Sequence, residues 1–436
     1  MAAGERTYFC IDMKTFYASV ECAERHLNPF ETNLVVADTS RGGTNALCLA
    51  ISPKLKAQGI RNRCRLSEIP NSIEYIAAPP RMQLYIDYAA DIYALYLKRF
   101  DAADIHVYSI DEAFIDATGY LAAYKTDGCT LARLLMGEIA KKLHIPSTAG
   151  VGTNLYLAKI ALDITAKRTK EHIGYLNEEL YRETLWDHKP ITDFWQIAGG
   201  TARRLARYGI YTMREVAACP EEVLYKAFGI NAELLIDHAW GRESCRISDI
   251  KNYKTKSKSV SFSQILPRDY TLEEARLVMA EMAFHGAQEL MRRHTVAKKV
   301  WVGIGYSRER HESTAAAGRL AYATALPSNI RPAVLKAFDA AALPGIPIRR
   351  LAVSFGDVCD ENCEGYDLFT DWHAVEKEKA GERAVMELSK KYGKNAVLRG
   401  TNYKESATQR ERNTMIGGHR AGYDDPRAES ETIHAL

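Results

Sequence analysis

Three carboxylates lie at the ends of short apolar runs, where metal-assisted chemistry could be built. Asp12 follows the apolar run 7–11, and the pair Asp111-Glu112 separates two further runs. Mg²⁺ prefers oxygen ligands and is often held by a few carboxylates together with substrate phosphates. Two such ions about 4 Å apart can activate a 3′-hydroxyl and stabilise a leaving pyrophosphate. The residues therefore permit a phosphoryl-transfer site, although an Asp-Glu turn and a helix-capping Asp12 would also explain them.

The first part of the chain must supply the elements that position these carboxylates. Short apolar runs predict buried strands, and apolar residues at helical spacing predict amphipathic helices. Strands are expected at 7–11, 34–37, 105–108 and 113–115, and helices after Thr15, over 82–100 and from an N-cap at Thr130 to Leu143. Strands and helices alternate to about residue 165, which predicts an α/β or α+β first domain.

The remaining chain divides into a helical region, a second sheet and a polar end. Residues 167–245 predict mostly short helices, including one from Thr201 to Gly209. The second sheet is expected to have strands at 260–266, 299–306, near 320–326 and at 351–355, and helices from the capping box Thr271-Glu274 to 293 and over 329–342. This β-α-β-β-α-β order predicts a small sheet with helices on one face. Beyond Cys363 the chain is polar, and only 373–392 has a helical rhythm.

The composition is that of a globular protein with several domains. The 436 residues exceed the usual size of one core, and 47% hydrophobic with 26% charged residues exclude a disordered, collagen-like or disulfide-stapled chain. No apolar run approaches the ~20 residues that span a bilayer, and the residues up to Arg6 lack a secretion signal. The nine cysteines are scattered, with only Cys359 and Cys363 close together. Reduced thiols, a cytoplasmic location and no membrane contact are therefore expected.

Positive charge is concentrated in one segment. The net charge is only +3, but residues 251–350 contain 17 Lys or Arg against 8 Asp or Glu, so the rest of the chain is negative overall. A basic module on a mildly acidic body is typical of a domain that tracks a nucleic-acid backbone. A solvated face on an unrelated domain would give the same pattern.

Two long motifs carry a resemblance to a known family. They are FCIDMKTFYASVE at residues 9–21 and YSIDEAFID at residues 108–116. These segments closely resemble the two signature motifs of the Y-family DNA polymerases, and the fit is best to the UmuC-like branch. The resemblance extends in order over residues 5–356, and motifs of this length are specific.

The resemblance implies an α+β multidomain fold, a right-hand polymerase with four parts. The palm would comprise residues 1–30 and 75–166, and the small fingers residues 31–74. A helical thumb with a helix-hairpin-helix would span 167–245. A βαββαβ little finger would follow at 251–356, and a C-terminal tail at 357–436.

The resemblance also implies roles for the residues of the first motif and its partners. Asp12 and Asp111 would bind two Mg²⁺ ions, Glu112 would be the third catalytic carboxylate, and the carbonyl of Met13 would add a backbone ligand. Tyr17 falls on the family's steric gate, a ring beneath the deoxyribose that leaves no room for a 2′-hydroxyl. Phe16 would contact the nucleotide, although it could also be a core residue.

Two lysines are expected at the triphosphate, whose oxygens need cationic partners. Lys159 ends the segment GVGTNLYLAK at residues 150–159, which matches a palm segment whose final lysine contacts the phosphates. Lys56 corresponds to a fingers arginine of many family members, but it lacks the bidentate fork of arginine. A tyrosine usual in that segment is Pro53 here, so its hydrogen bond is lost or replaced. A surface lysine without a role remains an alternative for Lys56.

Primer-template DNA would contact the thumb and the little finger. Gly199 and Gly200 match the helix-hairpin-helix, where glycines let backbone N–H groups approach a DNA phosphate. Ala198 stands where a glycine is common, and a tight turn before a helix would explain the two glycines equally well. The basic 251–356 segment, with Lys256 and Lys258 at its start, would track the duplex backbone without reading bases.

The segment GYDLF at residues 365–369 resembles the short peptide with which bacterial polymerases dock on the sliding clamp. Tyr366, Leu368 and Phe369 would enter an apolar pocket, although the first residue is Gly365 where glutamine is usual. The alternative is a segment that packs on its own little finger. Accessory proteins of the SOS response are further partners that the resemblance implies.

The sequence therefore predicts a template-directed DNA polymerase of low fidelity that adds deoxynucleotides opposite damaged template bases. Fingers confined to 31–74 cannot close tightly over a nascent pair, so distorted templates would be admitted. One alternative is another two-metal palm nucleotidyltransferase, such as a cyclase or a reverse transcriptase. The other is a non-catalytic, clamp-tethered DNA-binding subunit, which would be expected to lack one of the three carboxylates.

Overall fold

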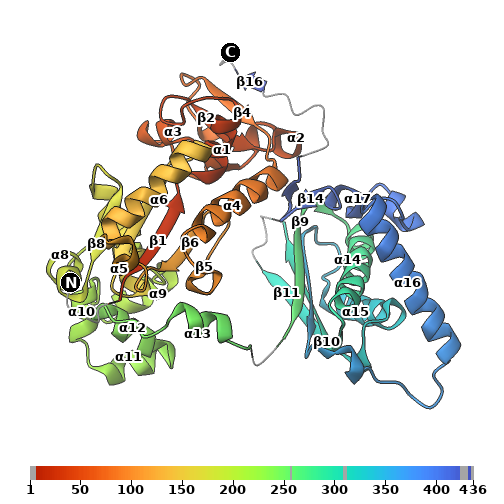
Figure 1. The fold of residues 1–436 in the computed structure, drawn as a ribbon. Coiled ribbons are helices and arrows are strands. Elements are labelled where there is room, and N and C mark those ends of the chain that lie inside the picture. Colours follow the sequence, from red (N-terminus) through yellow and green to blue (C-terminus); the bar gives the residue numbers. More distant parts are fainter. Residues whose placement is uncertain (1–5, 256–257, 308–311, 423–430, 434–436) are drawn as a thin grey trace. The chain divides into compact units, whose positions relative to one another are not determined.

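This computed structural model describes residues 6–255, 258–307, 312–422 and 431–433. The chain folds into two compact units (Figure 1). The first contains the residues up to 253 together with the last strand, β16 (Glu431–Ile433), and the second contains residues 254–421. Each unit is built around a sheet of its own.

The main sheet of the first unit has five strands in the order β5-β6-β1-β7-β8. They are β1 (Tyr8–Met13), β5 (Ile105–Val107), β6 (Glu112–Asp116), β7 (Ser147–Gly152) and β8 (Ile173–Leu176). The central strand β1 pairs antiparallel with both β6 and β7. Its residues from Tyr8 to Ile11 are all buried, which explains the uninterrupted apolar run.

Helices cover both faces of this sheet. On one face lie α4 (Met82–Leu97) and α6 (Gly128–Leu143), and an added Cβ at Gly128 would meet Thr7, Phe9 and Val151. On the other face lies α7 (Leu155–Ile160), so close that a Cβ at Gly150 would come within 2.0 Å of the Ala158 carbonyl oxygen. The glycines of β7 therefore allow α7 to lie directly on the strand. Figure 1 shows β1 running beneath α6 toward α1 (Phe16–Glu24).

A smaller sheet in the first unit has the order β16-β4-β2-β3. Strands β2 (Leu34–Ala37) and β3 (Cys48–Ile51) come from the region expected to form the fingers, whereas β4 (Tyr75–Ala78) comes from the first residues of the segment expected to be palm. Short helices α2 (Thr39–Gly42) and α3 (Pro53–Ala57) accompany them. Strand β16 pairs antiparallel with β4 and so adds the end of the chain to the edge of this sheet, which the sequence did not predict.

Short helices follow β8 in the first unit. They are α8 (Glu178–Leu185), α9 (Gly199–Ala206), α10 (Met213–Ala218), α11 (Glu221–Phe228), α12 (Asn231–Ala239) and α13 (Ile247–Asn252). Helices α8 to α12 pack around a core that includes Tyr181, Phe194, Leu205 and Leu235, whereas Ile247 of α13 belongs to a cluster with Tyr8 and Leu155. Residues 167–245 are mostly helical, as expected, but they also contribute β8 to the main sheet, which was not predicted.

The second unit contains an antiparallel sheet in the order β11-β10-β12-β9. Its elements are β9 (Val260–Tyr270), α14 (Leu272–Arg292), β10 (Thr295–Tyr306), β11 (Ser313–Thr324), α15 (Pro327–Ala341) and β12 (Ile348–Gly356), the expected β-α-β-β-α-β order. Both helices lie on one face of the sheet (Figure 1). Thr271 and Glu274 form the expected capping box at the start of α14.

Residues 357–421 are folded, whereas the polar sequence predicts a tail. They contain β13 (Cys359–Asp360), α16 (Trp372–Tyr392), α17 (Gln409–Arg412) and the hairpin β14 (Met415–Ile416) with β15 (His419–Arg420). The buried carboxylate of Glu281 on α14 accepts hydrogen bonds from Asn402 Nδ2 (2.6 Å) and Thr408 N (2.9 Å). Polar anchors hold this segment, and hydrophobic periodicity does not reveal polar anchors.

Two helix starts differ from those expected. Helix α6 is capped by Asp127, whose side chain accepts from Thr130 N at 3.0 Å, so Thr130 is inside the helix and not its N-cap. Thr15 precedes α1 in a left-handed conformation (φ +47°), and its side chain caps no backbone N–H. In both places a Thr before an apolar run had suggested the cap.

Candidate active site

The strand register brings the three carboxylates together at one end of the main sheet. Asp12 on β1 is the direct cross-strand partner of Glu112 on β6. The backbone N–H of Met13 donates to the carbonyl of Asp111 at 2.9 Å, which ties the residue before β6 to the end of β1. Residues about a hundred positions apart in the sequence thus share one site.

The carboxylates repel one another in a partly buried place. Burial, and then the negative charges of Asp111 and Glu112, raise the pKa of Asp12 to about 7. Asp111 is oriented by Ser109, whose hydroxyl donates to its Oδ1 at 2.6 Å. A bound cation would offset this repulsion, lower the pKa of Asp12 and favour its ionised form.

Lys159 already provides one positive charge. Its Nζ lies 2.8 Å from Glu112 Oε1 and 3.2 Å from Asp163 Oδ2. Burial would lower the pKa of Lys159, but Cys10, Asp163 and Glu112 outweigh burial and raise it. The buried thiol of Cys10 donates to Glu112 Oε1 at 3.0 Å. Both oxygens of Glu112 are therefore engaged, and Lys159 stands beside the carboxylates.

The donor set suits a hard cation in its chemistry, because every side-chain donor is a carboxylate oxygen and their charges repel. Within the described residues, however, no three His, Cys, Asp or Glu side chains are arranged so that they could hold a metal ion. The oxygens of Glu112 already accept hydrogen bonds from Cys10 and Lys159. Metal binding would thus require Glu112 to exchange its partners.

Tyr17 and Phe16 differ in exposure. Tyr17, in the first turn of α1, is half-buried, and its pKa is raised by burial and by the charge of Asp111. Its hydroxyl is thus within electrostatic reach of the carboxylates. Phe16 is buried, which favours the core alternative for this ring.

Lys56 and Lys14 belong to the same electrostatic neighbourhood. The pKa of Lys56 on α3 is lowered by desolvation, while the charge of Asp12 acts in the opposite direction. Burial likewise lowers the pKa of Lys14, with Asp12 opposing and Lys56 adding to the effect. Sequence reasoning passed over Lys14, although it lies in the first motif. Pro53 occupies the first turn of α3, a favoured position for proline, behind the N-cap Ser52.

The two thumb glycines open a helix. Gly199 and Gly200 form the first turn of α9, and the N-cap Ala198 provides no side-chain hydrogen bond. A Cβ at Gly200 would meet no atom within 4 Å. The first N–H groups of α9 are therefore accessible to an anion such as a phosphate.

The open face of the second sheet carries cations that the sequence analysis did not single out. Val300, Val302 and Ile304 of β10 face the helices, so Lys299 and Trp301 face the opposite side. Arg319 lies across from Lys299 on β11, and Arg350 of β12 lies across from Gly305. Between them the face has small residues, namely Gly303, Ala315, Ala317, Ala352 and Ser354. The alternation of apolar with polar or small residues along 298–306 could have predicted this exposed face from the sequence.

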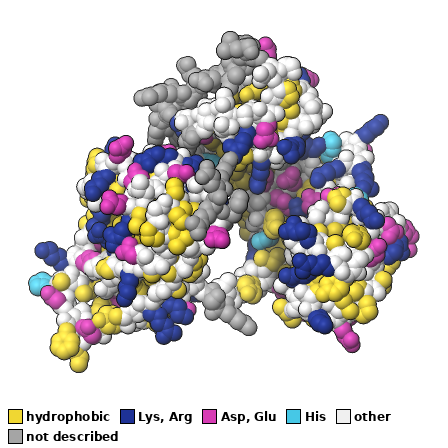
Figure 2. All heavy atoms as spheres, turned by 180° about the vertical axis from the view of Figure 1, so that it is seen from behind, with side chains coloured by type: hydrophobic (Ala, Val, Ile, Leu, Met, Phe, Trp, Pro, Cys, Tyr) yellow, Lys and Arg dark blue, Asp and Glu magenta, His cyan; other side chains and the backbone are white. Residues whose placement is uncertain are grey.

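Of the two lysines expected to contact DNA, Lys258 is exposed just before β9, and its carbonyl accepts from Val358 N at 3.1 Å. Lys256 lies outside the described residues. Figure 2 shows that Lys and Arg side chains are dispersed among acidic and apolar ones on the visible face and form no single continuous patch. A DNA contact of the second unit would therefore depend on spaced cations.

The segment with the proposed clamp peptide divides into an anchored and an exposed part. The ring of Tyr366 packs against Trp372 (centroids 4.3 Å apart), and its hydroxyl accepts from Lys379 at 2.8 Å. Leu368 and Phe369 are 98% and 94% exposed. Tyr366 therefore packs on the second unit, whereas Leu368 and Phe369 do not.

Comparison with known proteins places this arrangement in a family. Residues 11–163 match the impB/mucB/samB family and residues 257–368 match the C-terminal domain of that family. The chain belongs to the impB/mucB/samB family, within the Y-family DNA polymerases. The match spans parts of both units.

Two full-length relatives come from Bacillus subtilis (strain 168). UvrX, a protein named for UV-damage repair, is 32% identical over 428 residues, with 95% of this chain and 98% of the relative covered. DNA polymerase IV 2 is 30% identical over 427 residues, with 95% and 99% covered. A solved Y-family DNA polymerase chimera has the same fold, with a TM-score of 0.63 at 21% identity, covering 81% of this chain and 99% of the chimera.

These findings confirm the family, the α+β right-hand fold and the enzyme class, a DNA-directed DNA polymerase. DNA and deoxynucleoside triphosphates are accordingly its substrates. The matches also argue against the alternative of another kind of palm nucleotidyltransferase. Within the described part of the chain, no helix has both the length and the apolar character that crossing a bilayer demands.

Proposed function

We propose that this polymerase extends primers opposite damaged template bases, with Asp12, Asp111 and Glu112 as its catalytic carboxylates. The observation that carries the proposal is the register of β1 with β6, which places all three at one sheet end. The family members named for UV-damage repair and as DNA polymerase IV support work on damaged templates. All three carboxylates are present, which argues against a non-catalytic DNA-binding subunit.

The carboxylates and the carbonyl of Met13 would hold two Mg²⁺ ions, which when bound supply positive charge at the primer 3′-hydroxyl and at the leaving pyrophosphate. Lys159 is the side chain that would exchange partners. Its ammonium group pairs with Glu112 in the present structure, and a triphosphate beside the site would attract it instead. Lys56 of α3 and Lys14 after β1 would add positive charge near Asp12.

Tyr17 would act as the gate for the sugar. Among the rings of the first motif, Phe9 and Phe16 are buried and Tyr17 is partly exposed, and the charge of Asp111 helps to raise the pKa of Tyr17. A ring at this place would occupy the space that a ribonucleotide's 2′-hydroxyl needs. Phe16 would support the gate from the core.

DNA would be held by two kinds of backbone contact. The uncapped N–H groups of α9 at Gly199 and Gly200 would receive one phosphate. Lys299, Arg319 and Arg350 on the open face of the second sheet would track others, with small residues between them allowing close approach. Neither contact reads a base, which suits a polymerase that must accept altered templates.

Leu368 and Phe369 would dock on a sliding clamp. They are exposed apolar side chains on a short segment that Tyr366 fixes to the second unit, so they are presented without being buried. Such anchors commonly provide most of the affinity of a peptide contact. Accessory proteins of the SOS response would be further partners. All nine cysteines are free thiols, which suits a reducing compartment such as the cytoplasm.

Primer extension with purified protein tests the proposal. Templates with and without an abasic site or a pyrimidine dimer would be compared at matched primer-template concentrations, with Mg²⁺ and with a chelator. We expect template-directed extension past the lesion that the chelator abolishes. Extension that stops at every lesion would contradict the damage-related role, and no extension on any template would contradict catalysis.

A further inference from the structure

The ring of Tyr17 rests on a second tyrosine. Tyr85, in the first part of α4, lies parallel to it, with the ring centroids 4.5 Å apart and an interplanar angle of 18°. Tyr85 is 0% exposed, whereas Tyr17 is half-buried. The exposed face of the pair is therefore Tyr17, and Tyr85 is its support from the core.

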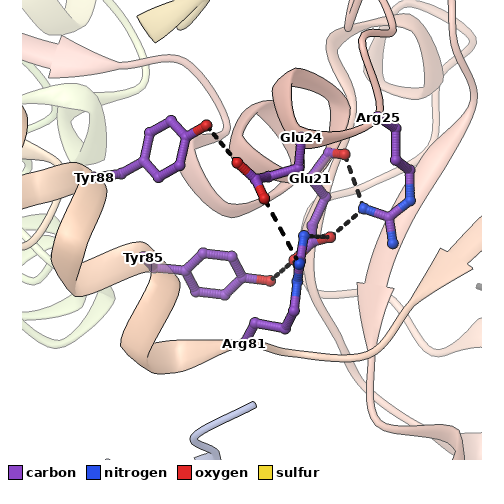
Figure 3. Close-up of polar contacts among 6 residues, drawn as sticks. All are labelled: Glu21, Glu24, Arg25, Arg81, Tyr85 and Tyr88. Carbon is purple, nitrogen blue, oxygen red and sulfur yellow. Dashed lines mark hydrogen bonds and ion pairs between the residues drawn. The ribbon is translucent and has the colours of Figure 1, made fainter. Parts of the chain in front are cut away.

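The supporting ring is itself fixed by a buried carboxylate. The hydroxyl of Tyr85 donates to Glu21 Oε1 at 2.8 Å (Figure 3). Glu21 is 0% exposed and belongs to α1, the helix that carries Tyr17. Burial and the charge of Glu21 hold the pKa of Tyr85 well above its usual value, so the hydroxyl keeps its proton and remains a donor.

Arg81 completes this arrangement with a bidentate contact. Its Nε donates to Glu21 Oε1 at 2.9 Å and its Nη2 to Oε2 at 2.8 Å. Arg25 also donates to the Glu21 carboxylate. Burial would lower the pKa of Arg81, but the hydrogen bonds and the charge of Glu21 raise it. Oε1 thus accepts from one arginine and from the tyrosine hydroxyl, and Oε2 accepts from two arginines.

The spacing of these residues fixes one helix against another. Tyr17 and Glu21 are four residues apart on α1, and Arg81 and Tyr85 are four residues apart at the start of α4. Residues at this spacing lie on the same helix face. A buried ion pair is weak evidence for stability because desolvation offsets its attraction. The contact of Glu21 with Arg81 is better explained by its effect on orientation, because it fixes the side chains of α1 and α4 that face each other.

We infer that Glu21, Arg81 and Tyr85 are positioning residues for Tyr17 and thereby help the enzyme to reject ribonucleotides. The inference rests on the proposed role of Tyr17 as the sugar gate. Stacking on Tyr85 fixes the orientation of the Tyr17 ring, and the contacts with Glu21 and Arg81 fix the position of Tyr85. A gate free to swing would leave room for a 2′-hydroxyl.

A neighbouring pair one turn further along both helices offers a matched control. Tyr88 of α4 donates to Glu24 Oε1 of α1 at 2.8 Å, the same kind of bond between the same helices (Figure 3). In the described structure Tyr88 makes no ring contact with Tyr17. Glu24 also lies 3.8 Å from Arg81 through its other oxygen, and Tyr88→Leu leaves that ion pair and the bonds of Glu21 in place (Figure 3). Loss of Tyr88 should therefore disturb the helix pair without loosening the gate.

The experiment measures kcat/KM for a ribonucleotide and for the matching deoxynucleotide on undamaged primer-template. Tyr85→Leu should raise the ratio of ribonucleotide to deoxynucleotide efficiency severalfold to roughly tenfold, the scale of losing one aromatic pair. Tyr85→Phe, which keeps the ring and loses the bond to Glu21, should raise it less. Tyr88→Leu should leave the ratio unchanged. A purely structural role would lower both efficiencies together and would not move the ratio.

Tyr17→Ala separates this inference from the function on which it rests. If Tyr17→Ala raises the ratio but neither Tyr85 variant does, the positioning role is overturned and the gate stands. If Tyr17→Ala leaves the ratio unchanged, both are overturned. In the Tyr17→Ala background, Tyr85→Leu should add nothing further, and an additional rise there would also overturn the inference. Should Tyr85→Leu fail to fold, an unchanged ratio in Tyr85→Phe decides against it.

Discussion

The sheets of the two units carry their charge in different ways. In the first unit both faces of β1 are covered, and Asp12, Asp111 and Glu112 meet at the end of the strand, where burial and mutual repulsion raise the pKa of Asp12 to about 7. In the second unit only one face is covered, and on the other face Lys299 and Arg319 are exposed cross-strand neighbours, with Lys299 Nζ 2.7 Å from Asp357 Oδ2. The carboxylates around Asp12 are desolvated and strongly coupled, whereas the cations of the open face are solvated, so that water and salt screen their interactions.

Removing one charge from the coupled group should have the largest effect. Asp12→Ala or Asp111→Ala should lower the rate of nucleotide insertion by at least ~10³-fold, because metal-assisted charge stabilisation is worth several kcal/mol. Binding of primer-template DNA should persist, since the cations of the second sheet and α9 remain. Single-turnover insertion and a DNA-binding titration on the same variants would test both expectations.

Asp116→Ala is the matched control. Asp116 is on β6 with Glu112, but it pairs with Arg6 at 3.4 Å and lies at the opposite end of the strand. Its loss should leave insertion near the wild-type rate. Insertion by Asp12→Ala at a comparable rate would show that the carboxylates are not coupled to the reaction, and the contrast between the two sheets would fail.

The sequence predicted three of the five strands of the main sheet, namely β1, β5 and β6, and β2 of the smaller sheet. The uninterrupted apolar runs 7–11 and 34–37 mark β1 and β2, which are buried. Strands β7 and β8 were missed, and β7 (Ser147–Gly152) is rich in small residues and has no long apolar run. The carboxylates were found from motifs. Their contacts were not, because the pairing of Asp12 with Glu112 and the bond from Lys159 depend on strand register and side-chain direction. The support of Tyr17 by Tyr85 joins two helices and leaves no periodic signal.

Prediction was poorer where polar groups hold the fold. Residues 357–421 have few apolar positions, and they are anchored by Glu281 and by Glu382, which accepts from Arg399 Nη2 at 2.9 Å and from Gln288 at 3.1 Å. Buried carboxylates of this kind cannot be distinguished from surface ones in the sequence. Unlike Asp12, Glu281 has neutral donors and no carboxylate neighbour among its hydrogen-bond partners, which marks it as structural.

Glu281 therefore provides a test of the distinction between reactive and structural carboxylates. Glu281→Leu would leave Asn402 Nδ2, Thr408 N and Gln409 N without their acceptor, which should cost about 3 kcal/mol of unfolding free energy in the second unit. Glu281→Gln should cost less because it retains an acceptor oxygen. Urea unfolding followed by a probe in the second unit would measure both.

Insertion of a nucleotide by folded Glu281→Leu should stay close to wild type, because this carboxylate makes its contacts within residues 254–421. The distinction between a structural Glu281 and a catalytic Asp12 would be wrong if folded Glu281→Leu reduced insertion as strongly as Asp12→Ala. The structural role of Glu281 would be wrong if the leucine variant were as stable as wild type, since the buried donors would then need no acceptor.

The exposed pair in the second unit should matter for partners and not for folding. Replacing both Leu368 and Phe369 by Ala should weaken docking on a sliding clamp by at least ~10²-fold, because two apolar anchors are truncated. The measurement is the ratio of primer extension with clamp to extension without it. The double variant Leu388→Ala/Tyr392→Ala removes exposed apolar surface from α16 and should keep the ratio. A retained ratio in the Leu368/Phe369 variant, together with lower stability, would instead indicate packing on the second unit.

The smallest expected effect concerns the separate charges of the open sheet face, and it tests their independence. Lys299→Ala and Arg350→Ala should each weaken DNA binding by the full-length protein modestly, because each would remove one phosphate contact. Log affinity falls with log salt by about 0.9 for each phosphate neutralised, so the slope should decrease by about one in each variant and by about two in the pair.

Independence follows from geometry. Lys299 and Arg350 are both exposed, and Arg350 lies across from Gly305, six residues along β10 from Lys299. That is about 20 Å of strand, more than a Debye length, so the two charges are largely screened from each other. Lys299 also pairs with Asp357 at 2.7 Å, in an exposed ion pair that a phosphate would displace. Arg276→Ala removes an equal charge from the helix-covered side, where Arg276 pairs with Asp339 at 2.8 Å, and should leave the slope unchanged. Equal changes in all three variants would mean that only net charge matters. A change in the pair much larger than the sum would show that these charges are coupled like those around Asp12.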